Sequence, residues 1–403
     1  CADSADAMAT HGRSLSVSVR EGDLEDVDNS EGKDIGLRVM VGQRQACVSS
    51  SDFSNASLEA LAERAVAMAR LAPEDPYCGL ADDDLLERNP SDLDMFDPKV
   101  ISPEALKARA LDIEKAALSV KGITQAEGAS ASWSTSGMYF MTSGGFAAGR
   151  RSSRHDIGVM ALASKDGDME RDADFDGTRW FEDLKDGEII GISAGQRAVA
   201  RLGASQMASG QMPVMYDRRV AAGFVGALLG AANGAAIARG ISFLKDHLGE
   251  QVFAPGINII DDPDMLRGHG SRPWDGEGVK TRKYNIVEDG RLTTWLLNSA
   301  SARQLGLVST GHGNRSIGSP PSTSSANTYL APGLKTPEEL MSGIKSGLLV
   351  TDMFGPSLNN NTGDYSVGVA GFRIENGERT TSVSEITVAG NLKEMCRSMT
   401  PAN

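Results

Sequence analysis

The sequence predicts an α+β protein, with an N-terminal part built from sheet and helix and a larger, mixed, strand-rich C-terminal domain. Apolar and polar residues alternate over several long runs, which is typical of antiparallel strands with one buried face. Helical patterns follow these runs at irregular intervals, so a doubly wound parallel sheet is disfavoured. The 403 residues exceed what a single core usually supports, and two or three domains are expected.

The first expected domain, residues 1–72, contains strands followed by a helix. Apolar residues alternate with serines near its start, and the same period returns over residues 35–41. Ser57 is expected to cap a helix with apolar residues at i, i+3, i+4 and i+7, which ends before Pro73. The Pro- and Asp-rich segment 73–98 shows no sustained period and is interpreted as a connection.

The second expected domain, residues 99–205, begins with a helix instead. Ser102 followed by Pro103 and an acidic residue predicts the helix start. Short alternating runs rich in Ser, Gly and aromatic residues over 123–171 predict an antiparallel sheet packed on that helix. A second helix is expected at about 188–202.

The third expected domain, residues 213–403, follows a small, polar, Pro-terminated boundary. A strand at 214–216 leads into an apolar, Gly-rich segment, 220–241, which is interpreted as a buried helix. Its small residues at helical spacing predict close packing on a neighbour: Gly223, Gly226, Gly230 and Gly234. Further strands are expected at 257–260, 280–287, 292–297, 347–351, 368–375 and 383–388, with a helix at 336–345.

Charge and composition argue against several functional classes. Forty basic and 54 acidic side chains give a formal net charge of −14, which repels both nucleic acid and anionic membrane surfaces. No apolar run reaches the roughly 18 residues that a membrane-spanning helix needs. The four cysteines show no CxxC spacing, so neither a disulfide framework nor a thiolate zinc site is indicated, and a cytoplasmic location is expected.

The histidines form no recognisable metal motif. A zinc hydrolase needs two histidines on one helical face, a third ligand and a carboxylate that activates water, as in HExxH. All five histidines are isolated in the sequence. Gln251 stands where a second histidine would complete an inverted motif with His247 and Glu250, so this pair is interpreted as a surface feature.

A first candidate site is a polar cluster of two Gly-flanked histidines and two loop acids. His269 and His312 could converge in space, although loop hydrogen bonding is the favoured interpretation. Asp275 and Glu277 are expected to be turn residues, because paired loop acids are usually solvated. A metal held by these histidines and an acid stays open as an alternative.

A second candidate site is the polar run 359–366, which contains Asn360, Thr362, Asp364 and Tyr365. A flexible loop beside a predicted strand suits backbone or peptide recognition. An ordinary surface loop fits the same pattern equally well.

Several further segments occur in a characteristic order. They are 167–172, 274–281, 285–297, 301–307 with 309–312, 362–366, 371–378 and 384–393. In this order they resemble the PmbA (TldE) branch of the TldD/PmbA family, also named modulator of DNA gyrase. The resemblance covers nearly the whole chain, and it implies a subunit of a heteromeric metalloprotease that matures microcin-type peptides and degrades unfolded antitoxins.

The resemblance also locates the family's zinc helix. In the TldD branch an HExxxH motif begins 13 residues after a Pro that opens a strand, and the same count from Pro213 reaches residues 226–231. Gly226, Ala227 and Ala231 stand in place of the two histidines and the glutamate, and none of them can bind zinc or transfer a proton.

The chain is therefore expected to be a non-catalytic subunit without a cofactor of its own, beside a TldD-type partner that carries the zinc. It would form part of the wall of a protected chamber and help to hold an extended peptide by strand addition. Two alternatives stay open. One is a metallopeptidase with a non-standard site, and the other is a peptide-binding module, self-associating as a homodimer, that has no protease partner.

Overall fold

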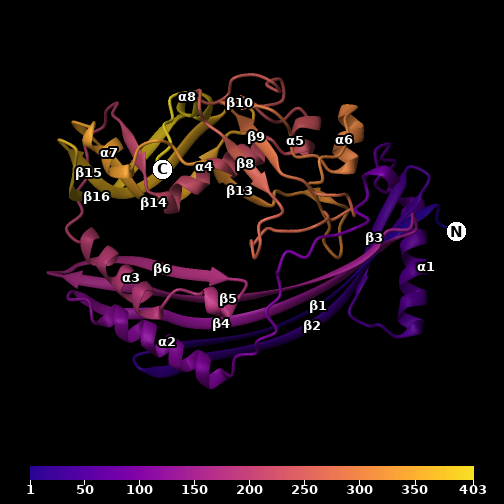
Figure 1. Ribbon diagram of the computed structural model, residues 1–403, viewed down its shortest axis with the longest axis horizontal. Helices are drawn as coiled ribbons and strands as arrows, with labels where there is room; N and C mark the ends of the chain where they lie inside the picture. The colour runs from indigo at the N-terminus through magenta and orange to yellow at the C-terminus, as the bar shows by residue number, and fades with distance from the viewer.

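The computed structural model describes residues 1–403. Six antiparallel strands form one sheet, which lies below the C-terminal domain in the view of Figure 1. Their order is β3-β2-β1-β4-β5-β6, with bounds β1 Ser4–Arg20, β2 Asp23–Val41, β3 Arg44–Ser50, β4 Ile123–Thr142, β5 Ala147–Lys165 and β6 Asp168–Thr178. The first three strands come from the first expected domain and the last three from the second. Both segments therefore share one sheet, joined where β1 pairs with β4.

Three helices cover the two ends of one face of this sheet. Helix α1 (Asn55–Leu71) packs on β2 and β3, while α2 (Pro103–Leu118) and α3 (Gly187–Arg201) pack on β1, β4, β5 and β6. Ile113 and Ile190 bring the two latter helices onto the inward-facing residues of the strands. Ser54, and not Ser57, caps α1, because Ser54 has the extended backbone of a cap and its hydroxyl accepts from the Ser57 amide.

The C-terminal domain contains two four-stranded sheets. One has the order β10-β9-β8-β13, with β8 Ile259–Asp262, β9 Tyr284–Glu288, β10 Arg291–Leu292 and β13 Asn327–Leu330. The other has the order β16-β15-β14-β7, with β7 Val214–Tyr216, β14 Ser346–Leu358, β15 Asp364–Glu375 and β16 Glu378–Asn391. A core of 25 buried residues draws on both sheets and on the helices beside them.

Short elements complete the chain. They are α4 Arg218–Ala231, α5 Gly234–Ala238, α6 Ser299–Leu305, α7 Pro337–Ser342, α8 Leu392–Arg397, the strand pair β11 Gly313–Asn314 and β12 Ser322–Thr323, and the 3-10 turns η1 Asp83–Leu85 and η2 Phe181–Asp183. None of the helices is long and apolar enough to cross a membrane.

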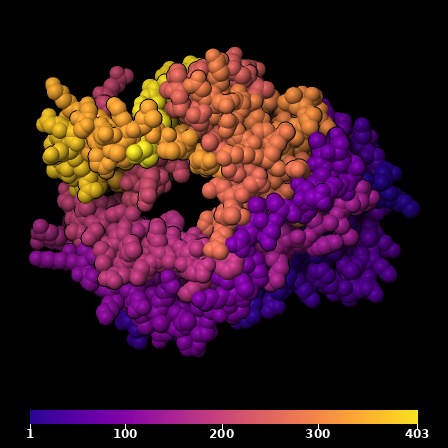
Figure 2. All heavy atoms as spheres, viewed as in Figure 1, coloured from indigo at the N-terminus to yellow at the C-terminus, as the bar shows by residue number.

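The C-terminal domain lies over the opposite face of the six-stranded sheet, and the two parts meet at both ends (Figure 1). At one contact Trp274 packs with Met8 and Phe140 of the sheet. At another, Arg201 of α3 pairs with Asp352 of β14 at 2.8 Å. Figure 2 shows an opening between the two parts, and α4 lies at its upper edge in the same view.

The predicted buried helix over 220–241 is wrong in two respects. The chain forms two helices: the first ends at Ala231 with Ala232 as its C-cap, and Asn233 caps the second. Helix α4 is also only half-buried, because its apolar period places Phe224, Leu228 and Ala231 against the core and leaves the opposite face exposed.

The glycines of this segment correct a second expectation. A Cβ on Gly226 or Gly230 would meet no atom within 4 Å, so these residues do not bring α4 close to a neighbour within the chain. Gly234 does, since a Cβ there would lie 2.7 Å from the Leu296 carbonyl oxygen. Close packing through small residues is therefore right for Gly234 and wrong for Gly226 and Gly230.

The predicted strand over 292–297 is also wrong beyond Leu292, where β10 ends. Backbone amides of residues 293–297 donate hydrogen bonds to separate parts of the domain and not to one neighbouring strand. The Thr293 amide donates to Ile286 of β9, whereas the Leu296 amide donates to Ala232 beyond α4. Residues 295–297 are apolar and buried, and a buried irregular segment can show the same run of apolar residues as a strand.

Candidate functional site

Buried charges lie where the C-terminal domain contacts the six-stranded sheet. Asp6 of β1 accepts hydrogen bonds from Arg38 of β2 at 2.5 Å and from Arg315 of the C-terminal domain at 3.1 Å. All three side chains are at most 4 % exposed. One carboxylate therefore accepts from two guanidinium groups and connects the two parts of the molecule.

A pair of buried acids follows directly after Trp274. Asp275 and Glu277 are 0 % and 3 % exposed, so the expectation that they are solvated turn residues is wrong. Asp275 accepts from the backbone amides of Glu277, Val279 and Gly313 at 2.7 to 3.0 Å, and Glu277 accepts from the amide of Ser299 at 2.7 Å. The two carboxylates can be buried because these backbone amides satisfy their oxygens with hydrogen bonds.

Burial and mutual repulsion shift the titration of both acids. Burial, together with the neighbouring Glu277 carboxylate, raises the pKa of Asp275 to about 7, against the amide hydrogen bonds that lower it. Burial likewise raises the pKa of Glu277, although the Ser299 amide and Arg38 act in the opposite direction. The pair therefore holds a proton at a pH where exposed acids have lost theirs.

Glu277→Gln tests this coupling through the pH dependence of stability. Because folding raises both pKa values, the folded chain retains a proton that the unfolded chain releases above pH ~4, and the free energy of unfolding falls as pH rises toward 7. The Gln carbonyl still accepts from Ser299 while the charge beside Asp275 is removed. The variant should gain about 1–2 kcal/mol relative to the native chain between pH ~5 and ~8 in urea unfolding.

Glu25→Gln is the matched control for that measurement. Glu25 lies at the surface beside Arg20, and its side chain is 40 % exposed. Its removal should leave the pH dependence unchanged, within the small effect expected of an exposed pair. Parallel pH profiles for Glu277→Gln and the native chain would contradict the shared proton.

The two candidate histidines lie in different surroundings. The His312 ring is buried between Asp261, at 3.2 Å from Nε2, and the Thr310 hydroxyl, at 2.7 Å from Nδ1. Burial alone would raise the pKa of Asp261, but the hydrogen bonds from His312 and Thr328 hold it below its usual value. His269 instead contacts the Gly177 carbonyl of β6 through its Nε2.

The polar cluster predicted from the sequence is thus assembled only in part. Gly313 follows His312, and its amide donates to Asp275, so His312, Asp275 and Glu277 lie in one buried region. His269 lies apart from them at the β6 contact. No three His, Cys, Asp or Glu residues come together in a way that could hold a metal ion.

The predicted polar loop forms the turn between β14 and β15. Thr362 donates to Asp364 at 2.6 Å, and Asn391 donates to the other oxygen of that carboxylate at 3.0 Å. The Asn360 carbonyl accepts from the Phe243 amide at 2.7 Å. The polar side chains of this loop are therefore mainly hydrogen-bonded to one another and to Asn391. Tyr365 points into the core beside Phe224 and contributes to packing.

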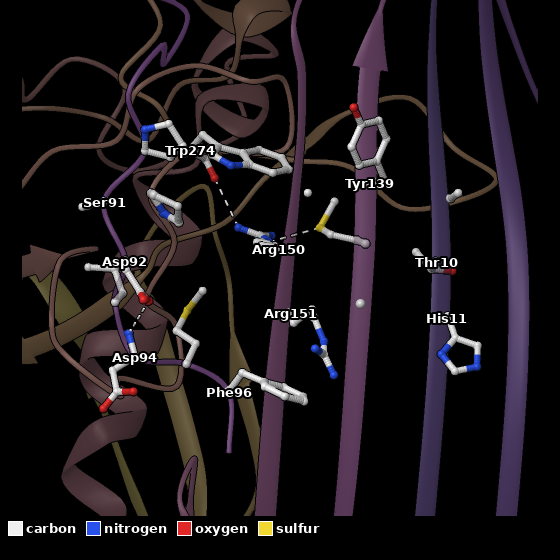
Figure 3. A pocket seen from close by; sticks show the side chains of 18 of the residues that line it. Thr10, His11, Ser91, Asp92, Asp94, Phe96, Tyr139, Arg150, Arg151 and Trp274 are labelled. Carbon is white, nitrogen blue, oxygen red and sulfur yellow. Dashed lines mark hydrogen bonds between the residues drawn. The ribbon is translucent and has the colours of Figure 1, made fainter. Parts of the chain in front are cut away.

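A cavity of about 970 Å³ lies beside the edge of β5 (Figure 3). Residues of β1, β4 and β5 line one side, and the connecting segment 90–96 with Pro273 and Trp274 lines the other. Figure 3 shows the Arg150 guanidinium directed toward Trp274 and the Arg151 side chain beside Phe96. This cavity is lined by aromatic rings and arginines that contact one another.

Neither Asp6, Arg38 and Arg315 nor the cavity residues were predicted from the sequence. The alternation of apolar and polar residues in β1 and β2 predicted one buried face, and the polar residues between the apolar ones were expected to face solvent. The C-terminal domain covers part of that second face. Arg38, which stands between Leu37 and Val39 in an otherwise apolar run, was the one local signal of a buried charge.

Comparisons with known proteins identify the family. Domain models described as PmbA/TldA metallopeptidase domain 1, central domain and C-terminal domain match residues 5–69, 96–202 and 209–403. The chain is 37 % identical to Metalloprotease PmbA of Escherichia coli O157:H7 over 399 residues, which cover 98 % of this chain and 86 % of that protein.

Two solved structures share the fold. A putative modulator of DNA gyrase from Bacteroides thetaiotaomicron superposes with a TM-score of 0.91 at 24 % identity, covering 100 % of this chain and 90 % of that one. TldE from Thermococcus kodakarensis superposes with a TM-score of 0.85 at 22 % identity, covering 98 % and 90 %. The α+β fold, the three matched domains and the sequence identity together show that the chain belongs to the PmbA/TldD metalloprotease family.

Proposed function

We propose that this chain is the non-catalytic, PmbA/TldE-like subunit of a two-component metalloprotease that acts on extended or modified peptides. The observation that carries the proposal is the composition of α4. At the positions that match HExxxH, Gly226 is exposed, Ala227 is partly buried against the core and Ala231 is buried. A zinc ion needs nitrogen, sulfur or oxygen ligands, so these residues do not fit the metal that the family implies.

The surroundings of α4 support a role in shaping a chamber. The helix lies beside the opening between the two parts of the molecule (Figure 2). Gly226 and Gly230 leave free space on that helix, as a surface beside a peptide path would require. In this proposal a TldD-type partner in the cytoplasm supplies the zinc and the general base, and this chain supplies wall and binding surface.

The test is a peptide-cleavage assay on this chain alone, a TldD-type partner alone, and both together, with an unfolded peptide as substrate. Activity should be confined to the mixture or raised at least about tenfold there. Cleavage by this chain alone, with stoichiometric bound metal, would favour a metallopeptidase with its own site.

A second measurement separates the remaining alternative. Light scattering of the mixed proteins should show a complex of the two chains. A homodimer that neither binds the partner nor changes its activity would support a peptide-binding module without a protease partner.

A further inference from the structure

The edge of β5 is open over the stretch that borders the large cavity. Strand β6 pairs with β5 only from His155 onward, so residues 147–154 have no strand neighbour on that side. The Ser153 amide donates across this edge to the Met95 carbonyl of the connecting segment. Backbone groups point alternately to the two sides of a strand, so those of Gly149 and Arg151 point to the same open side as Ser153.

No sheet neighbour satisfies these groups. The connecting segment bonds the edge at Ser153 and then diverges, and the cavity lies between it and Gly149. An unpaired edge inside a cavity offers main-chain donors and acceptors at the spacing of a β-strand. Such an edge suits an extended polypeptide.

Arg150 adds a charge that forms no salt bridge. Its Nη1 donates to the Trp274 carbonyl at 3.2 Å, and its Nε contacts the Met138 sulfur at 3.1 Å. None of the salt bridges of the chain involves Arg150, whereas Arg201 and Arg267 near this interface are paired with carboxylates. Burial and the nearby Arg272 lower the pKa of Arg150 to about 10, against the opposing effect of Asp275, which forms no salt bridge with it. A partly desolvated cation of this kind favours a carboxylate ligand.

The other charges of the cavity do not fill this role. Asp94 pairs with Arg267 at 2.6 Å, and Asp92 accepts from the Asp94 amide at 3.0 Å. Arg151 stacks over Phe96, with 3.6 Å between guanidinium carbon and ring centre, and is likewise free of an ion pair. Asp94 is thus ion-paired and Asp92 is hydrogen-bonded within the connecting segment, whereas Arg150 and Arg151 on the strand side form no salt bridge.

We propose that an acidic, extended peptide segment adds as a strand to the β5 edge at 147–152 and places a carboxylate side chain on Arg150. The proposal rests on the peptide-binding role proposed above and assigns it to a specific edge. The main-chain groups of Gly149 and Arg151 would bond to alternate residues of the peptide. Phe96 and the half-exposed ring of Tyr139 would contact its side chains.

Fluorescence anisotropy with this chain alone tests the proposal. The probe is a labelled, unstructured peptide of Ser, Thr and Ala with one central Glu, compared with its Gln counterpart. The Glu peptide should bind roughly tenfold more tightly. Arg150→Met should abolish that preference, and Arg150→Lys should restore part of it.

Arg171→Met is the matched control, since Arg171 is an exposed arginine on β6 that does not line the cavity. It should leave both affinities unchanged. If Arg150→Met does not fold, the Glu and Gln comparison on the native chain still decides the charge contribution. Equal binding of the two peptides would overturn the carboxylate assignment.

N-methylation of single peptide amides tests strand addition. Methyl groups at one set of alternate residues should weaken binding, while those at the other set should be tolerated. A flat response to N-methylation would overturn the strand assignment. Because no partner is present, these outcomes are independent of whether the cleavage assay finds partner-dependent activity.

Discussion

Asp6→Asn should lower the free energy of unfolding by about 3–5 kcal/mol. The variant removes the carboxylate charge shared by Arg38 and Arg315 and leaves two guanidinium groups buried without the anion that both contact. Removing one partner from a buried ionic group is far more destabilising than the net contribution of the group, because water cannot solvate the charges that remain. The contact between the C-terminal domain and β1–β2 should loosen first, since Arg315 belongs to that domain.

Urea unfolding measures the expected loss, and hydrogen exchange locates it. A second variant separates ionic from packing effects. Replacing Asp6, Arg38 and Arg315 together with Leu, Met and Met removes all the buried charges at similar volume and should recover most of the lost stability. Loss of less than about 1 kcal/mol for Asp6→Asn would show that water reaches the two arginines.

Trp274→Ala should destabilise the chain by about 3–5 kcal/mol. The indole is 1 % exposed and lies 5.3 Å from the Phe146 ring and 6.2 Å from the Phe140 ring, measured between ring centres. Deleting it removes buried apolar area, breaks both aromatic contacts and leaves a cavity. The cluster also contains Met8, so the lost packing lies between the C-terminal domain and the sheet.

Trp274→Phe keeps an aromatic ring at this position and should lose clearly less stability than Trp274→Ala in the same thermal and urea measurements. The two variants also distinguish packing from the charge of the cavity. Arg150 lies 4.9 Å from the Trp274 ring, so the Ala variant should change peptide binding as well as stability. Equal stabilities of the Ala and Phe variants would contradict the packing role of the indole.

Local sequence patterns predicted many elements correctly. Ser102 and Pro103 begin α2 as the capping pattern predicted, with the Ser102 hydroxyl accepting from the Ala105 amide. The strands expected at 280–287 and 292–297 leave room for the turn at Asp289 and Gly290 that connects β9 and β10, where both residues have a positive φ. These features depend on a few neighbouring residues and were therefore visible without tertiary information.

The candidate site was less predictable. Asp275 and Glu277 have the sequence of a solvated turn, yet amides from Ser299 and Gly313, distant in sequence, make their burial favourable. His269 and His312 have similar Gly-flanked contexts, but one is exposed against β6 and the other is buried beside Asp261. Sequence spacing carries no information on which backbone amides reach a side chain.

The sequence by itself determined the α+β class, the order of most helices and strands, the family, and the absence of zinc ligands at 226–231. Only the tertiary structure decided that one sheet runs through the first two segments and that the C-terminal domain covers its second face. A period of two identifies a buried face, but it cannot show whether another domain also buries the opposite one. That second burial makes Asp6 and Arg38 an ionic group and leaves Arg150 at an open strand edge.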